Sequence, residues 1–248
     1  MKIVSYGGGT NSTAMLIECV NRGIEVDLIL FADTGGERPH TYQYVRMFSD
    51  WLVEKGFPAI QTVKNGGVHK NLEQECLTRK ALPSLAYGFK TCSQKWKIRP
   101  QDQFLNRQPW AISQWEQGKK ITKLIGFDAD EPQRAKDYED KKYTVKYPLI
   151  EWEMGREECT KTIEDAGLCL PGKSACFYCP STKPTEVRQL KAIYPDLAQR
   201  AIDMENNADL SQLKGLGRNF AWSELLKNSE MFDDYSNTPE LACGCYDG

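Results

Sequence analysis

The sequence predicts an α/β fold built on a doubly wound, mostly parallel sheet, and two observations support this prediction. Apolar runs typical of buried strands alternate with amphipathic helical runs at short intervals between Met1 and Val63. The first of these strands leads through a glycine-rich turn directly into the first helix. Short right-handed crossovers of this kind place successive strands side by side and parallel.

The elements of this unit follow in a regular order. Residues 1–4 form the apolar opening strand, and residues 14–20 form an amphipathic helix after the turn. Residues 26–31 are almost all apolar, as expected of a strand buried on both faces of a parallel sheet. Apolar side chains recur at helical spacing over 39–54, and the next strand is 59–63.

The second half of the chain has a different pattern. Residues 121–127 indicate another strand, and residues 147–150 a short strand or turn. Residues 156–166 have helical spacing, and the chain is then mostly helical to about residue 227. The tail over 228–248 is loop-like.

Composition narrows the class of protein. At 248 residues the chain fits one large α/β domain or a domain with an appendage, and its net charge of −2 argues against a globally basic nucleic-acid clamp. The chain opens on a strand without a basic leader, and no run approaches the roughly 18 to 20 apolar residues of a membrane span. We therefore expect a cytoplasmic protein with no membrane partner. In that reducing compartment, nine cysteines favour metal or thiol chemistry over disulfides.

The glycine turn is expected to bind an anion. Glycine permits close backbone approach, and the first turn of the following helix presents unpaired N–H groups. The Walker pattern GxxxxGK[ST] lacks its Lys here, and the third Gly of a GxGxxG fingerprint is replaced by Ser12. A glycine-rich loop without a ligand is the alternative. The expected contact residues are Ser5, Gly7, Gly8, Gly9, Thr10, Asn11, Ser12 and Thr13.

Two further loops should reach the same crevice, because ligands of such folds lie beyond the carboxyl ends of the strands. Asp33 and Thr34 end the second strand, and Asp33 can hold Mg²⁺, contact a ribose or cap its own turn. After the strand 121–127 come Asp130 and Glu131, which can do the same work or form a solvated acidic loop, and then Arg134.

The cysteines indicate a metal site. Cys176 and Cys179 form a CxxC knuckle, far from the opening βαβ unit where a thioredoxin-type pair would stand. Cys92 precedes three cations, whose charge lowers a thiol pKa and balances an anionic cluster or an oxyanion. Those cations are Lys95, Lys97 and Arg99.

We expect Cys92, Cys176 and Cys179 to share one metal centre, and separate structural roles for the three are the alternative. The fourth ligand is left open between Cys159, Cys169 and the tail, and Cys159 can equally be a small core residue. Cys19 is expected in the core, and Cys76 has no evident partner.

Three landmarks resemble one known family. The glycine turn resembles the PP-loop, SGGx[DN]S, of ATP pyrophosphatases and the phosphoadenosine phosphosulfate (PAPS) reductase family, with Gly7 in place of the first Ser. Cys92 with its cations, then Cys176-x-x-Cys179 and Lys183-Pro184, resembles the cysteine arrangement of iron–sulfur adenylylsulfate reductases. Gly126 to Arg134 resembles the family's GxRxxESxxR segment, and Gly126 is included among the nucleotide contacts.

The resemblance implies a Rossmann-like PP-loop domain over 1–150 and a Cys-rich, mainly helical metal-binding region over 151–248 packed on it. It implies ATP, or PAPS or adenylylsulfate, together with Mg²⁺ and a four-iron, four-sulfur cluster. Zn²⁺ is the alternative metal, because a four-cysteine site serves both. The implied partners are a nucleic-acid acceptor and a sulfur-donor protein such as a cysteine desulfurase or thioredoxin, and a homodimer is one assembly that the sequence allows.

Departures from the family pattern direct the choice of reaction. A single Cys stands at 92, where the reductases carry adjacent cysteines, and Phe127-Asp128 replaces the Arg-bearing part of GxRxxES. We therefore expect an enzyme that adenylates an acceptor and transfers sulfur to it. A reductase that releases sulfite through Cys243 or Cys245, in a tail loosely similar to ECGxH, is the second hypothesis. A nucleotide sensor without turnover is the third.

Overall fold

A five-stranded, all-parallel sheet forms the centre of the molecule in the computed structural model, which describes residues 1–83, 85–86, 89–136, 139–210 and 213–229. The strand order is β3-β2-β1-β6-β7. The strands are β1 (Lys2–Tyr6), β2 (Leu28–Asp33), β3 (Ile60–Lys64), β6 (Ile121–Leu124) and β7 (Tyr143–Lys146). The predicted α/β class is confirmed, in a Rossmann-like arrangement.

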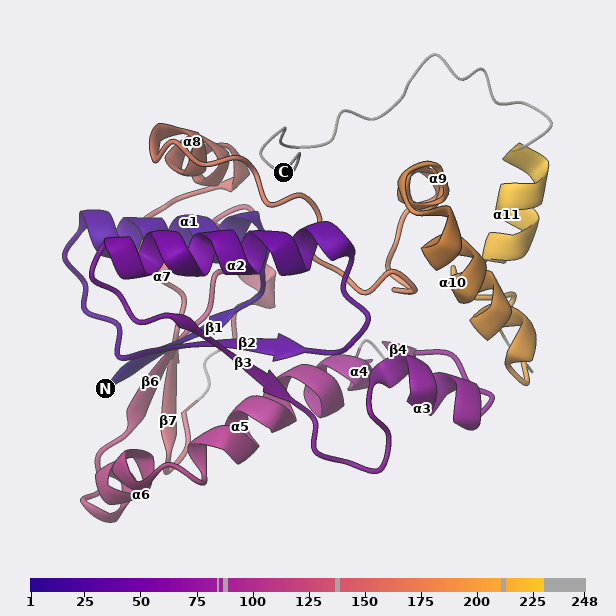
Figure 1. Ribbon diagram of the computed structural model, residues 1–248. Helices are drawn as coiled ribbons and strands as arrows, with labels where there is room; N and C mark the ends of the chain where they lie inside the picture. The colour runs from indigo at the N-terminus through magenta and orange to yellow at the C-terminus, as the bar shows by residue number, and fades with distance from the viewer. Residues whose placement is uncertain (84, 87–88, 137–138, 211–212, 230–248) are drawn as a thin grey trace.

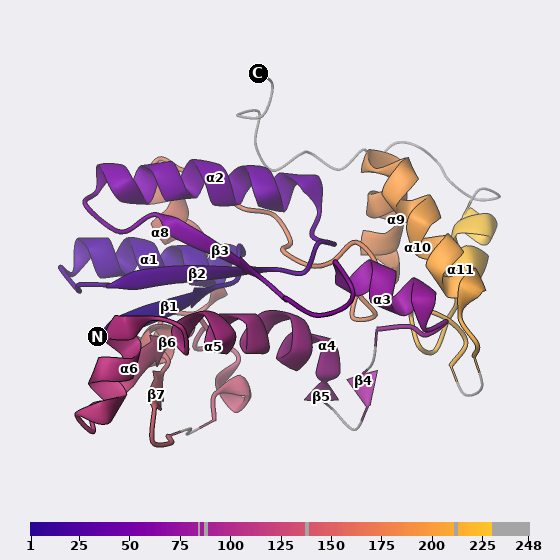
Figure 2. The same cartoon turned by 60° about the horizontal axis from the view of Figure 1, so that its bottom comes forward.

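Helices cover both faces of this sheet (Figures 1 and 2). One face carries α1 (Thr10–Asn21), α2 (Pro39–Glu54) and α8 (Arg156–Asp165), and the other carries α5 (Arg99–Leu105) and α6 (Pro109–Glu116). Successive strand residues point to opposite faces, so Val4 packs in the cluster under α1 and Ile3 in the cluster on the α5 side. The sheet is therefore buried on both sides, as its apolar strands require.

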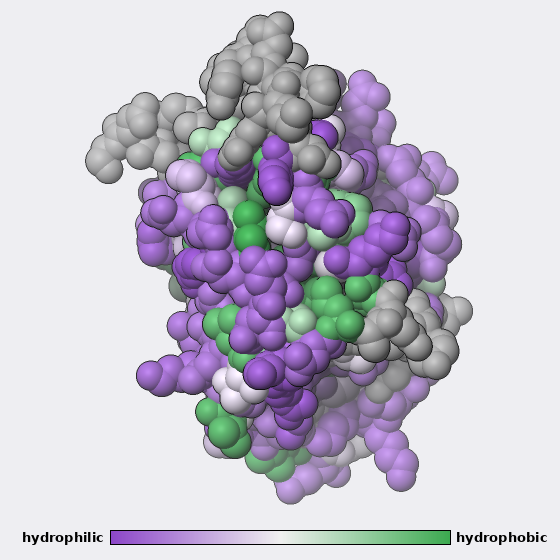
Figure 3. Space-filling view, turned by 90° about the vertical axis from the view of Figure 1, so that its right-hand side faces the viewer, coloured by the Kyte–Doolittle hydropathy of each residue, from purple (hydrophilic) through white to green (hydrophobic). Residues whose placement is uncertain are grey.

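A helical part lies beyond the carboxyl ends of the strands (Figure 1). It consists of α3 (Leu72–Thr78), α9 (Pro184–Ile193), α10 (Pro195–Asn207) and α11 (Trp222–Ser229). Beside α3 lie the antiparallel pair β4 (Leu85–Ala86) and β5 (Phe89–Lys90), then α4 (Thr91–Ser93) and a π-helical turn, η1 (Gln94–Ile98). These helices have a hydrophobic cluster of their own, which includes Trp96, Tyr178 and Trp222. Figure 3 shows that their outer face is mostly hydrophilic, with small, separate apolar areas.

Some elements differ from the sequence-based expectation. Residues expected as a short strand or turn form the helix α7 (Pro148–Glu151), because a proline at the first helical position has its φ already set for a helix. The helix α1 begins at Thr10, earlier than residue 14, with Gly9 as its N-cap. The strand β7 was not predicted. The helix α8, assigned with the Cys-rich region, packs against α1. Within the described residues, no helix is long and apolar enough to cross a membrane.

A Glu205→Ala variant is expected to lose about 3 kcal/mol of unfolding free energy. The Glu205 carboxylate is buried and accepts backbone N–H groups from Leu216 at 2.7 Å, Trp222 at 2.8 Å and Ser223 at 3.0 Å, so truncation leaves these donors unpaired. Urea unfolding measures the loss. Glu224→Ala on the exposed side of α11 is the matched control, and equal stability of the two variants would contradict the prediction.

Candidate functional site

The glycine loop, residues 7–9, lies at the carboxyl end of the central strand β1, where the chain order of the sheet reverses between β1 and β6. Gly8 has a φ of +72°, and a Cβ there would lie 3.1 Å from Thr41 Cγ2 and 3.4 Å from the Phe31 ring, so only glycine fits. Among the described residues, the amides of Thr10 and Asn11 have no acceptor. The loop and the first turn of α1 therefore offer backbone donors to an anion.

The hydroxyls of α1 shape the loop from inside. Ser12 Oγ accepts from the Gly7 amide at 3.2 Å and donates to the Gly9 carbonyl at 3.1 Å. Thr13 Oγ1 donates to the same carbonyl at 3.0 Å, and Ser5 Oγ donates to Gln101 Oε1 at 2.7 Å. The hydroxyls of Ser5, Ser12 and Thr13 are thus already hydrogen-bonded within the protein, whereas the amides of Thr10 and Asn11 are available to a ligand.

The rim segment, residues 126–134, packs directly on this loop. A Cβ on Gly126 would lie 2.8 Å from Ser12 Cα, so the absence of a side chain lets the two backbones touch. Asp128 is buried, and its Oδ2 accepts from Asn11 Nδ2 at 2.7 Å. Its Oδ1 has no hydrogen-bond partner among the described residues. Asp128 is therefore the rim carboxylate that reaches the start of α1.

The acidic residues predicted for this role have other partners. Asp130 accepts from the Arg156 amide at 2.7 Å, because the start of α8 presents an unpaired N–H there. Glu131 forms a surface ion pair with Arg134. The Arg134 guanidinium lies 4.2 Å from the centre of the Phe127 ring.

The Asp33 carboxylate is held by three donors, which matches its turn-capping interpretation. Its Oδ1 accepts from the Gly35 amide and from Tyr42 Oη, both at 2.7 Å, and Lys64 Nζ lies 3.0 Å from Oδ2. Burial is the main cause that raises the pKa of the Tyr42 hydroxyl, and its hydrogen bond to Asp33 raises the pKa further. That proton therefore stays on Tyr42.

The cysteine knuckle, residues 176–179, is joined to the loop after β2. Thr34 Oγ1 lies 3.1 Å from Cys176 Sγ, and the Phe177 amide donates to the Gly36 carbonyl at 2.8 Å. Glu37 pairs with Cys176 in an isolated antiparallel bridge. Just before the knuckle, the Ser174 hydroxyl donates to the carbonyl of Gly7. A residue predicted to contact the ligand and a predicted metal ligand thus meet at one edge of the sheet.

The predicted cations near Cys92 are found beside carboxylates and a cavity. Lys97 Nζ lies 3.0 Å from Glu37 Oε1. Burial is the largest single effect and lowers the pKa of Lys97, but the neighbouring negative charges, Glu37 first among them, together outweigh it, and the pKa is raised. Lys95 forms an ion pair with Glu75. Burial acts to raise the pKa of the Glu75 carboxyl, but hydrogen bonds from Lys95 and Trp96 outweigh this effect, so the pKa is lowered. Arg99 is exposed and lines the cavity.

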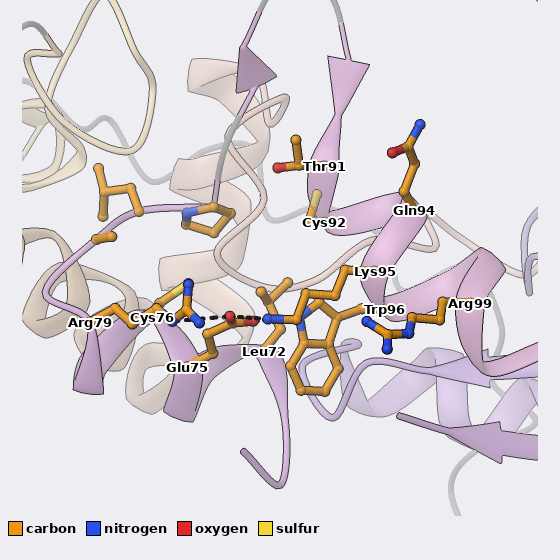
Figure 4. Close-up of a pocket in the computed structure, with 13 residues that line it drawn as sticks. Leu72, Glu75, Cys76, Arg79, Thr91, Cys92, Gln94, Lys95, Trp96 and Arg99 are labelled. Carbon is orange, nitrogen blue, oxygen red and sulfur yellow. Dashed lines mark hydrogen bonds and ion pairs between the residues drawn. The ribbon is translucent and has the colours of Figure 1, made fainter. Parts of the chain in front are cut away.

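This cavity, of about 570 Å³, lies between α3 and the start of α4 (Figure 4). Cys76 on α3 and Cys92 on α4 both line it. Burial raises the pKa of the Cys76 thiol to about 12, and the neighbouring charges of Glu75 and Cys92 add to the rise. Cys76 therefore has a thiol neighbour that its place in the sequence does not indicate.

None of the seven cysteines in the described residues is in a disulfide, and they fall into two groups. Cys76 and Cys176 belong to the hydrophobic cluster of the helical part, and Cys92 and Cys179 pack against it. The proposed fourth ligands, Cys159 and Cys169, pack instead in the cluster around α1 and α8, as does Cys19, whose predicted core position is confirmed. Burial raises the pKa of Cys159 to about 12.

Among the described residues, no three His, Cys, Asp or Glu side chains come close enough to hold one metal ion. The tail residues Cys243 and Cys245, predicted as catalytic, lie outside the described residues.

Sequence reasoning overlooked several residues at this edge of the sheet. Arg38 is buried, and its Nε and Nη2 have no partner among the described residues; burial lowers the pKa of its guanidinium. The buried Tyr178 hydroxyl also lacks a partner there. The charged pair Glu37-Arg38, directly after Gly35-Gly36, was the available signal.

No family model matches this chain, and no curated protein matches its sequence. The function must therefore be argued from the chemistry of this edge of the sheet.

Proposed function

We propose that the protein is a PP-loop enzyme similar to the PAPS reductase family. It binds ATP or a related adenine nucleotide, adenylates a nucleic-acid acceptor and supports iron–sulfur-dependent sulfur transfer to it. One observation supports this proposal most strongly. The cysteine knuckle lies close to the glycine loop: Ser174, two residues before the knuckle, donates to the Gly7 carbonyl, and Thr34, just after β2, contacts Cys176.

The nucleotide half of the proposal rests on backbone donors. The free amides at the start of α1 and the positive end of the helix dipole favour a phosphate chain. Asp128 suits Mg²⁺ at the same place, because its buried Oδ1 has no partner among the described residues and carboxylate oxygens are the usual protein ligands of this ion. ATP with Mg²⁺ would therefore find both an anion site and a metal ligand.

The proposed reaction has two steps. An acceptor oxygen attacks the α-phosphate, the bond between the α- and β-phosphates breaks, and pyrophosphate leaves onto the glycine loop. The amides hold the charge that develops on the leaving oxygens. In the second step, sulfide from the sulfur donor attacks the acceptor carbon that carries the adenylated oxygen. The carbon–sulfur bond forms as the carbon–oxygen bond breaks, and AMP leaves with the electron pair. The position of the knuckle near the glycine loop suits this step.

The resemblance to iron–sulfur adenylylsulfate reductases favours an iron–sulfur cluster over a single zinc ion for the cysteine half. Four cysteines of the described residues border one hydrophobic cluster. A four-iron cluster holds its thiolates farther apart than a zinc ion does. When bound, such a cluster supplies a redox-capable site that can hold sulfide. Anaerobic absorption spectra with iron, zinc and sulfide analysis distinguish the two metals.

The rim segment favours sulfur transfer over reduction of PAPS or adenylylsulfate. Asp128 puts a buried carboxylate where the resemblance places an anion-binding arginine segment, and this charge repels an additional sulfate or phosphate. Phe127 stacks on Tyr147 at 5.5 Å between ring centres, which gives that position an aromatic surface.

The anaerobically purified, iron-loaded protein is therefore expected to release no sulfite from PAPS or adenylylsulfate with a thiol donor. Sulfite release is measured against a no-enzyme control, and clear release would favour the reductase. Deletion of residues 243–248 then separates the two enzymes, because only a reductase of this type loses all turnover while it keeps nucleotide binding.

A further inference from the structure

Thr34 contacts both the cysteine knuckle and the start of α3, the helix that carries Cys76. The Leu72 amide at the start of α3 donates to the Thr34 carbonyl at 3.2 Å, while Thr34 Oγ1 contacts Cys176 Sγ at 3.1 Å. Cys76 follows Leu72 by four residues, so both side chains lie on one face of α3. Both are buried in the hydrophobic cluster that contains Cys176.

The segment that carries Cys92 is tied to both of these cysteines. Trp96 Nε1 donates to Glu75 Oε2 at 2.8 Å, and Glu75 immediately precedes Cys76. Lys97 Nζ donates to Glu37 Oε1 at 3.0 Å, and Glu37 is the bridge partner of Cys176. One turn of η1 therefore connects Cys92 to α3 on one side and to the knuckle on the other. Figure 4 shows Cys76 and Cys92 on two walls of one cavity.

An unsatisfied donor lies within the knuckle, beside Gly36. Tyr178 lies inside the knuckle, its side chain is fully buried, and its hydroxyl has no partner among the described residues. A Cβ on Gly36 would lie 2.3 Å from that hydroxyl, so Gly36 is needed to admit it. A buried hydroxyl without an acceptor is costly, and cluster or thiolate sulfur is an acceptor suited to it.

We propose that Cys76 is the fourth ligand of an iron–sulfur cluster that Cys92, Cys176 and Cys179 also hold, and that Cys159 and Cys169 take no part. This inference rests on the proposed function. Lys95 and Lys97 lie on the same segment as Cys92, and each is paired with a carboxylate, Glu75 and Glu37 respectively. Cys159 and Cys169 are held in the other cluster, under α8.

Cluster content of single variants tests this assignment. The full chain is purified anaerobically and reconstituted with iron and sulfide, and bound iron, acid-labile sulfide and visible absorption are measured. The wild type is expected to hold about four iron atoms per chain. Cys76→Ser should lose at least half of this iron, whereas Cys159→Ser, Cys169→Ser and a Cys243→Ser/Cys245→Ser double variant should match the wild type.

Circular dichroism and thermal melting confirm that each apo variant is folded, and Cys76→Ala replaces Cys76→Ser if the buried hydroxyl prevents folding. A wild type that binds no iron overturns the cluster part of the proposed function. A loaded wild type with an equally loaded Cys76 variant overturns only the ligand assignment. Loss of iron in the Cys159, Cys169 or tail variant, with Cys76→Ser unaffected, transfers the fourth position to that residue.

Discussion

A Gly126→Ala variant is expected to bind ATP at least about tenfold more weakly than the wild type. The added Cβ would lie 2.8 Å from Ser12 Cα and 2.9 Å from Ser12 N, and both are backbone atoms in the first turn of α1. Backbone cannot rotate away as a flexible side chain can, so the turn must shift and its free amides change direction. Calorimetric titration with ATP and Mg²⁺ measures the affinity.

The same substitution should cost about 1–3 kcal/mol of stability through overpacking. Gly66→Ala is the matched control, because a Cβ at Gly66 meets nothing within 4 Å. We expect the control to leave both the affinity and the melting temperature unchanged. A folded Gly126→Ala protein with wild-type ATP affinity would show that the loop is not the phosphate site.

A Lys97→Met variant is expected to be less stable by about 3 kcal/mol. The side chain of Glu37 has 0% exposure, and its Oε2 has no partner among the described residues, so Lys97 is the cation that offsets its charge. Removal of Lys97 leaves a carboxylate buried without a counter-charge. Since the side chain of Lys97 itself is 35% exposed, we expect the lower end of the range seen for broken buried pairs.

Substitution of Glu37 as well as Lys97 shows whether the unpaired Glu37 charge causes the loss of stability. Glu37→Gln together with Lys97→Met removes both charges and should recover part of the lost stability, which a double-mutant cycle in urea measures. Lys120→Met is the control, because its partner Glu139 is 61% exposed and water already screens the pair, so no measurable change is expected. Equal losses in the Lys97 and Lys120 variants would contradict a structural role for the buried pair.

Local patterns made the first half of the fold predictable. The bounds 39–54 of α2 follow from helical spacing after Pro39, and β2 is visible as a continuous apolar run. The strand β7 was missed because Tyr143–Lys146 is only four residues long and directly follows a charged stretch. Signals of this kind depend on a few neighbouring residues, and they weaken where a strand is short.

The site was less predictable because its contacts are distant in sequence. Nothing in the spacing of Cys76 and Cys92 indicates that α3 and α4 border one cavity, since that depends on how η1 packs against α3. Of the acidic residues in the rim segment, the sequence pattern pointed to Asp130 and Glu131 and passed over Asp128. In the fold, Asp128 accepts a hydrogen bond from Asn11 in α1, whereas Asp130 accepts one from the Arg156 amide at the start of α8. The spacing of these residues in the sequence does not indicate which partner each one has.

Product analysis of ATP tests the proposed function most directly. The iron-loaded full chain is incubated anaerobically with labelled ATP and Mg²⁺, with and without transfer RNA and DNA as acceptors, and the labelled products are separated. We expect pyrophosphate together with adenylated acceptor, and free AMP once sulfide is supplied. Pyrophosphate should form faster when an acceptor is present and should be greatly reduced in the Gly126→Ala variant. Cleavage to ADP and phosphate, or bound ATP that is not cleaved under any of these conditions, would contradict the proposal.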